Sequence, residues 1–260
     1  MDIYVVSIPR FRERFNYIHA HVKARSRRTV HAICVDGADP DTLPDFLSTS
    51  GASGFNQGQL GCAAAHLLAY DRIVASGDKA GFVVEDDVSL PPGIDEILDK
   101  LQSEMAADEV ISLYNRTIKR EKFSRIDALQ LAGIGISLIY PLQAASMRTS
   151  AACLVGREAA RGILVCNRNL QYVADDWAAF YRTGAVRSIR LAHPIPCRMK
   201  SFQSTIGYRR DDSLPVKVRN LLLRNPLGKA LIALRRQLIF RIKERNIVLV
   251  EERSAISSRR

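Results

Sequence analysis

Apolar positions along the chain form short continuous runs that predict buried strands and spaced patterns that predict helices. Strands are predicted at residues 3–8, 30–35, 81–84, 110–114, 133–140, 150–155 and 186–195. Helices are predicted at residues 10–22, 56–75, 94–105, 157–165 and 177–181. Because strands and helices alternate, we expect an α/β fold with a mostly parallel central sheet.

Two segments carry more specific local signals. Asn56 can cap the helix that follows it, and Gln59, three residues later, can reach back to the backbone of Asn56. The segment from Arg116 to Arg125 is highly charged, and we expect it to be a surface loop near the functional site.

The strand predicted at residues 81–84 runs directly into three consecutive carboxylates, Glu85, Asp86 and Asp87. Neighbouring ionised carboxylates repel one another, so a cation is expected to compensate them. Mg²⁺ or Mn²⁺ is the economical candidate, because these ions prefer carboxylate and phosphate oxygens. A strand end in an α/β sheet is also where ligands usually bind. For the triplet taken alone, a solvated turn is an equally good interpretation.

Four other polar residues each have a functional and a structural interpretation. Asp36 follows a predicted strand and could hold a ribose hydroxyl, although Asp36 beside Gly37 is also an ordinary turn. His66 lies among small helical residues and is interpreted as a hydrogen-bonded structural histidine rather than a metal ligand, because no second histidine is spaced to pair with it. Asp175 and Asp176 precede a short helix, so one of them caps it or accepts a proton in a sugar-transfer reaction.

Composition places the chain among ordinary globular proteins. The chain has 260 residues, a length sufficient for one domain of catalytic size. Of these residues, 47% are hydrophobic and 25% are charged, as in ordinary globular proteins. Its five cysteines are widely spaced without a CxxC pair, which argues against a disulfide framework or structural zinc site and favours a reducing compartment. The sequence shows no signal-peptide pattern and no apolar run of bilayer length.

The positive charge is concentrated near the C-terminus. Residues 213–260 contain 12 Lys or Arg and 3 Asp or Glu, a net charge of +9 out of +11 for the whole chain. Leucines recur there at helical spacing, so residues 211–260 are predicted to be a basic amphipathic helical extension of a domain spanning residues 1–210. The extension fits an anionic membrane surface or packing on protein, whereas few aromatics accompany its basic residues, so nucleic-acid binding is not expected.

Several motifs occur in the order typical of one family. The chain resembles glycosyltransferase family 25, the bacterial lipooligosaccharide galactosyltransferases and their relatives, over about residues 3–208. The matching motifs are Ser7-Ile8-Pro9-Arg10 with Arg14, Ala32 to Gly37, Gly58-Gln59-Leu60-Gly61-Cys62 with His66, Val83 to Val88, Thr149 to Val155, Asp175-Asp176-Trp177, and Pro196 with Ser204-Thr205-Ile206.

The resemblance implies a GT-A-like nucleotide-sugar-binding fold and transfer of galactose or glucose, with inversion, from a UDP-sugar to an oligosaccharide or glycolipid acceptor. It implies that Glu85, Asp86 and Asp87 hold Mn²⁺ or Mg²⁺, and that Asp175 or Asp176 is the catalytic base or contacts the acceptor. It also implies a cytoplasmic protein, peripheral on the inner face of the bacterial inner membrane. The residues expected at the donor are Ser7, Arg10, Arg14, Asp36, Gly61, His66 and Asp86.

The basic extension also supports an alternative from a different class. A variant or non-catalytic member of the family would act as a membrane-surface or polyanion-binding protein through residues 211–260. In either case the C-terminal helices offer a surface through which the chain could form a homo-oligomer.

Overall fold

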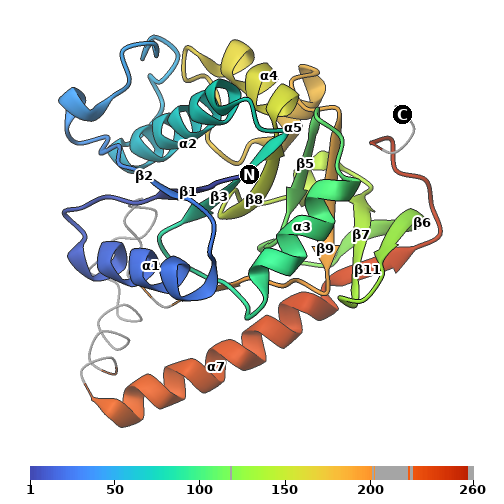
Figure 1. The fold of residues 1–260 in the computed structure, drawn as a ribbon. Helices are drawn as coiled ribbons and strands as arrows, with labels where there is room; N and C mark the ends of the chain where they lie inside the picture. Colours follow the sequence, from blue (N-terminus) through green and yellow to red (C-terminus); the bar gives the residue numbers. More distant parts are fainter. Residues whose placement is uncertain (118, 201, 203–221, 223–224, 257–260) are drawn as a thin grey trace.

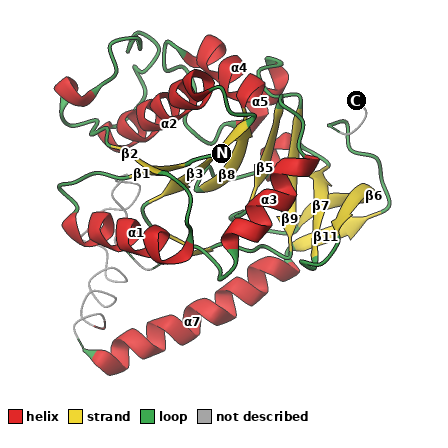
Figure 2. Ribbon diagram, in the orientation of Figure 1, coloured by secondary structure: helices red, strands yellow, loops and turns green. Residues whose placement is uncertain are grey.

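The strands and helices follow the predicted alternation in the computed structural model, which describes residues 1–117, 119–200, 202, 222 and 225–256 (Figures 1 and 2). The strands are β1 (Ile3–Val6), β2 (Val30–Ile33), β3 (Ala80–Glu85), β4 (Val88–Ser89), β5 (Glu109–Ser112), β6 (Glu121–Leu131), β7 (Ile136–Pro141), β8 (Ala152–Gly156), β9 (Ser188–His193), β10 (Arg198–Met199) and β11 (Ile247–Val250). The helices are α1 (Arg12–Arg25), α2 (Gln57–Ser76), α3 (Ile94–Glu104), α4 (Arg157–Asn167), α5 (Trp177–Arg182) and α7 (Pro226–Arg245).

A nine-stranded sheet forms the centre of the described structure, in the order β11-β6-β7-β9-β5-β8-β3-β1-β2. The pairings give seven of these strands one direction, while β7 and β8 run opposite to them. The predicted α/β class with a mostly parallel sheet is confirmed. Strands β4 and β10 form a separate antiparallel pair beside it.

Helices cover both faces of the sheet. Helices α2 and α4 pack together on one face, and α1 and α3 lie on the other (Figure 1). The predicted capping pattern is present at the start of α2: the Asn56 side chain accepts from the backbone N–H of Gln59 at 2.9 Å, and Oε1 of Gln59 accepts from the N–H of Asn56 at 3.0 Å. These reciprocal bonds satisfy two amide groups that the first turn of a helix leaves without partners.

The register of three adjacent parallel strands brings distant parts of the sequence to one edge. Val6 at the end of β1 lies opposite Ile33 of β2 on one side and Glu85 of β3 on the other. The segments that leave these three strands therefore begin side by side. Strand β8 runs the other way, so its first residues meet the end of β3, where the N–H of Glu85 donates to the carbonyl of Ala151 at 2.8 Å.

Two expectations from the sequence need correction. Residues 121–125, predicted as part of a charged loop, are the start of strand β6. The C-terminal extension is not helical throughout, because β11 follows α7 and pairs in parallel with β6. The Ser204-Thr205-Ile206 motif lies outside the described residues.

No helix within the described ranges combines the length and the apolar content needed to cross a membrane.

Candidate functional site

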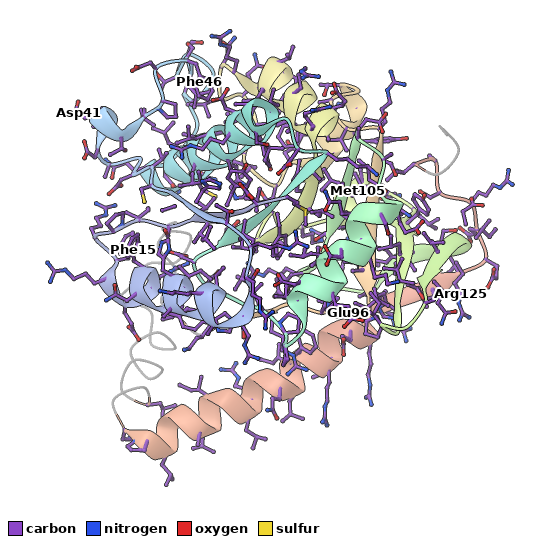
Figure 3. All side chains as sticks on the ribbon, in the orientation of Figure 1. Phe15, Asp41, Phe46, Glu96, Met105 and Arg125 are labelled. Atoms are coloured by element: carbon purple, nitrogen blue, oxygen red, sulfur yellow. The ribbon has the colours of Figure 1, made fainter. Side chains whose placement is uncertain are left out.

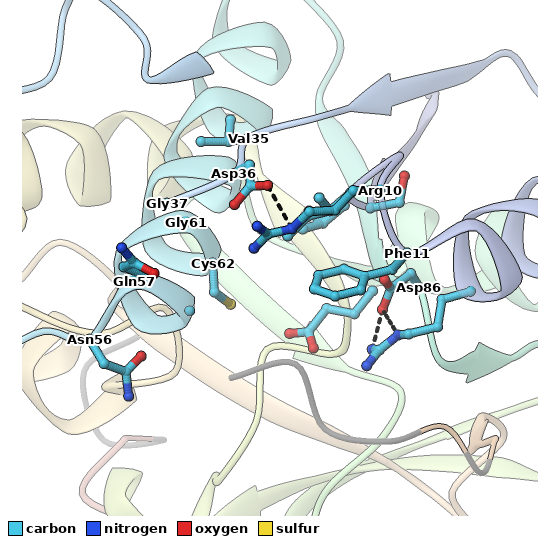
Figure 4. Close-up of a pocket in the computed structure, with 16 residues that line it drawn as sticks. Arg10, Phe11, Val35, Asp36, Gly37, Asn56, Gln57, Gly61, Cys62 and Asp86 are labelled. Atoms are coloured by element: carbon cyan, nitrogen blue, oxygen red, sulfur yellow. Dashed lines mark hydrogen bonds and ion pairs between the residues drawn. The ribbon is translucent and has the colours of Figure 1, made fainter. Parts of the chain in front are cut away.

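A cavity of about 280 Å³ opens at the carboxyl ends of β1, β2 and β3 (Figure 4). Its walls come from the segments after these strands and from the first turns of α2. Carboxylates and arginines project into the same space, as expected of a site for a polar, charged ligand. The lining residues are Val6, Ser7, Ile8, Arg10, Phe11, Arg14, Val35, Asp36, Gly37, Asn56, Gln57, Gly58, Gly61, Cys62, Glu85 and Asp86.

One wall of the cavity is formed where the segment after β2 meets α2. Asp36 Oδ2 lies 2.9 Å from Nε of Arg10, and Asp36 Oδ1 accepts from the N–H of Ala38 at 3.0 Å (Figure 4). Asp36 is therefore a turn residue and a cavity residue at once. A Cβ added to Gly37 would lie 2.6 Å from the amide nitrogen of Gly61. Glycine at these positions permits the close approach of the two backbones.

The acidic triplet is held by an arginine from α1. Arg14 Nε donates to Asp86 Oδ1 at 2.9 Å, and its Nη2 contacts the same oxygen and lies 3.2 Å from Asp87 Oδ2. All three side chains are mostly buried. Within the described residues, Oδ1 of Asp87 is buried without a hydrogen-bond partner. Arg14 thus compensates only part of the negative charge of the triplet.

Glu85 belongs to a separate hydrogen-bonded group. Its Oε1 accepts from Ser150 Oγ at 3.0 Å and lies 3.3 Å from His66 Nε2, while His66 Nδ1 lies 3.4 Å from the hydroxyl of Tyr70. Burial acts to raise the pKa of Glu85, but its contacts with His66 and Ser150 and the charge of Arg14 outweigh that effect and lower it. Glu85 is therefore an ionised carboxylate at neutral pH.

The other carboxyl groups around Glu85 show the opposite shift. Burial raises the pKa of Asp86 and of Asp175, and it raises the pKa of Asp87 to about 7. The negative charge of Glu85 is the next largest cause that raises these three pKa values. Each of these groups is thus disfavoured as an anion by burial and by its acidic neighbours. A cation bound here would relieve this excess of negative charge, so the donor groups suit a divalent metal ion.

The two aspartates before α5 have different environments. Asp176 Oδ1 accepts from the N–H of Ala179 at 3.0 Å and caps the helix. Asp175 instead interacts electrostatically with Glu85 and His66. Trp177 Nε1 donates to the carbonyl of Thr149 at 3.0 Å, which fastens this segment to the start of β8. The structure therefore brings Asp175 near the acidic triplet although ~90 residues separate them in sequence.

Sequence reasoning missed Cys62, which lines the cavity. Ligand atoms of Cys62, His66 and Glu85 lie within 4.8 Å of one another, so this group is a second set of possible metal donors. The spacing of Cys62 and His66 was the available signal, because residues four apart share a helix face. Burial raises the pKa of the Cys62 thiol well above its ordinary value, and that opposes the thiolate form a metal requires.

The residues expected from the sequence take three kinds of position. Those that line the cavity are Ser7, Arg10, Arg14, Asp36, Gly61, Glu85 and Asp86. Asp87 and His66 are not among the lining residues but contact them, through Arg14 and Glu85 respectively, and Asp175 interacts with Glu85. Asp176 is engaged in the helix cap.

Comparison with known proteins identifies a family for most of this structure. A family model described as "Glycosyltransferase family 25 (LPS biosynthesis protein)" matches residues 1–176. A search of curated proteins found no match. The matched residues include all three strand ends that frame the cavity and both aspartates that precede α5.

Proposed function

We propose that this chain, which belongs to glycosyltransferase family 25 of lipopolysaccharide biosynthesis, transfers galactose or glucose from a UDP-sugar. The acceptor would be a saccharide of a lipooligosaccharide-type glycolipid, met at the cytoplasmic face of the bacterial inner membrane. The observation that carries the proposal is the cavity at the ends of β1, β2 and β3, where arginines and carboxylates converge.

The donor would bind against the wall formed by the segment after β2 and by α2. Arg10 is half exposed, so its guanidinium can leave Asp36 to contact a phosphate. Asp36 Oδ2 then becomes free to accept from a ribose hydroxyl, while Oδ1 keeps its bond to the N–H of Ala38. Gly37 and Gly61 carry no side chains where they meet, and that part of the wall would leave room for the nucleotide.

The acidic triplet would hold a divalent cation beside the diphosphate of the donor, because its negative charge exceeds what Arg14 compensates. We assign the ion to Glu85, Asp86 and Asp87 rather than to Cys62, His66 and Glu85, since Mn²⁺ and Mg²⁺ prefer oxygen ligands. When bound, such an ion neutralises charge on the diphosphate leaving group. Arg14 would keep Asp86 and Asp87 in place for that role.

Asp175 is the proposed catalytic base. In an inverting transfer, the acceptor oxygen forms a bond to C1 of the sugar as the bond from C1 to the UDP oxygen breaks, and the acceptor hydroxyl proton passes to a carboxylate. The raised pKa of Asp175 increases its basicity, which favours proton uptake. Asp176 would only position the segment, because its carboxylate caps α5.

Matched substitutions at the two aspartates test this assignment. We expect Asp175→Asn to lower kcat for sugar transfer by ~100-fold or more with little change in KM for the donor, because general bases contribute about 10²–10⁴-fold. Asp176→Asn should leave the melting temperature close to that of the wild type and kcat within a few-fold of it, because the Asn side-chain oxygen can still accept from the N–H of Ala179 and cap the helix. Loss of kcat in Asp176→Asn, with normal turnover in Asp175→Asn, would contradict the assignment.

A further inference from the structure

Helix α7 carries a row of exposed apolar side chains. Leu227, Leu231, Leu234, Leu238 and Ile242 are each 54–77% exposed. At about 100° per residue, these five positions fall within an arc of about 80° on the helix surface. We call this row the leucine stripe. The other large apolar side chain exposed to a similar extent, within the described residues, is Val165 on α4, at 78%.

Helix α7 is attached to the rest of the protein, although its leucine stripe is exposed. The guanidinium of Arg198 lies 4.6 Å from the ring centre of Phe240, and Phe240 packs against the hydrophobic core. Strand β11 follows α7 directly, pairs with β6, and buries Ile247. The helix is thus fastened near its C-terminal end, while it lies at the edge of the molecule with side chains projecting into open space (Figure 3).

Basic side chains border the leucine stripe. Arg241 and Arg235 are exposed and lie about 20° beyond its two edges, on the same helical geometry. Arg245 is also exposed, and Glu244 is the only acidic residue in the sequence of α7. A stripe of leucines between arginines matches a surface that is anionic outside and apolar beneath.

We propose that α7 docks the protein on an anionic lipid bilayer, with the leucine stripe inserted at the boundary between headgroups and acyl chains. Arg235, Arg241 and Arg245 would contact lipid phosphates around it. A second copy of the chain fits this face less well, because pairing two stripes would bring their arginines together with few acidic partners. The inference concerns lipid binding alone and does not depend on the proposed donor or base.

Vesicle flotation of the full chain tests the proposal. The wild type should float with vesicles of phosphatidylglycerol and phosphatidylcholine and bind far less to phosphatidylcholine alone. The combined change Leu231→Ser and Leu234→Ser should weaken binding by about tenfold or more, because two inserted side chains are lost. Val165→Ser, which removes the comparably exposed apolar side chain on α4, should leave binding unchanged.

A second pair of measurements separates lipid binding from folding and self-association. All variants should keep the wild-type melting temperature, because the changed side chains are exposed. Arg235→Gln with Arg241→Gln should weaken binding to anionic vesicles and reduce its dependence on salt. Equal flotation of the wild type and the double leucine variant would overturn the proposal. It would also be overturned if the wild type did not float but formed a dimer, by light scattering, that the leucine changes dissociate.

Discussion

Replacing Arg14 with methionine should destabilise the protein in a manner that depends strongly on pH. Arg14, Asp86 and Asp87 have side chains that are 11%, 10% and 21% exposed, so the loss of Arg14 leaves two mostly buried carboxylates beside the ionised Glu85. Breaking a buried ion pair by removing one partner costs about 3–5 kcal/mol. Methionine retains a long, unbranched apolar stem, so the main change is the loss of the guanidinium charge and its hydrogen bonds.

Protonation limits this cost, and the limit sets the pH dependence. At 1.36 kcal/mol per pH unit, protonating a carboxyl of ordinary pKa 3.8 costs about 5 kcal/mol at pH 7.5 and about 2 kcal/mol at pH 5.5. In the variant the folded pKa of Asp86 rises further above its unfolded value. Such an acid penalises the folded state increasingly as pH rises from the unfolded to the folded pKa. The loss relative to wild type should therefore be about 3–5 kcal/mol at pH 7.5 and at most about 2 kcal/mol at pH 5.5.

Urea unfolding at the two pH values in EDTA measures these losses directly. Mn²⁺ should restore part of the stability at pH 7.5, because a cation among the carboxylates replaces the missing charge. Arg161→Met is the matched control, since Arg161 pairs with Glu158 at the surface with side chains 50% and 43% exposed, and it should cost about 0–1 kcal/mol at both pH values. A loss in Arg14→Met that is equal at the two pH values, or no larger than in the control, would refute the reasoning.

Two further substitutions test the wall of the cavity and the third carboxylate. Gly37→Ala should destabilise the fold by about 1–3 kcal/mol and weaken nucleotide binding in calorimetry, because its Cβ would overlap the Gln57 carbonyl oxygen. Gly54→Ala, whose Cβ meets nothing within 4 Å, should change neither quantity. In metal-free protein, the gain in melting temperature of Asp87→Asn over wild type should grow from about pH 4 to pH 7 and stay constant above that. The wild-type carboxyl has a pKa of about 7, so over this range it stays protonated in the folded protein while it ionises in the unfolded chain. A difference in melting temperature that does not change between about pH 4 and pH 7 would show that Asp87 ionises at its ordinary pKa.

The sequence sufficed for features that are encoded locally. The apolar run into Glu85 predicted a buried strand that ends in carboxylates, and β3 has that form. Asn56 and Gln59 predicted the start of α2, because a capping pattern needs only four consecutive residues. Because ligands usually bind at the carboxyl ends of strands in an α/β sheet, the predicted class also indicated a site at Glu85, whereas the other donor residues were expected from the family resemblance.

Features that depend on distant partners were not visible in the sequence. Strand β6 begins with Glu121, whose charge suggested a loop, but Arg148 Nη2 and Ser146 Oγ donate to that carboxylate at 2.8 and 2.9 Å. The outer edge of β6 is paired with β11, which lies more than a hundred residues further along the chain. The contact of Arg14 with Asp86 likewise joins residues 72 positions apart. No local pattern specifies such pairings, since they arise only when the sheet assembles.

The most direct test of the proposed function is release of UDP from UDP-galactose and UDP-glucose by the purified full chain, with and without Mn²⁺. We expect Mn²⁺ to stimulate UDP release from one of these donors and a lipooligosaccharide acceptor to increase the rate. Asp175→Asn should bind the donor but transfer the sugar more slowly, by ~100-fold or more. If neither donor raises the melting temperature or releases UDP in the presence of Mn²⁺ and acceptor, the protein is not a transferase that uses UDP-galactose or UDP-glucose.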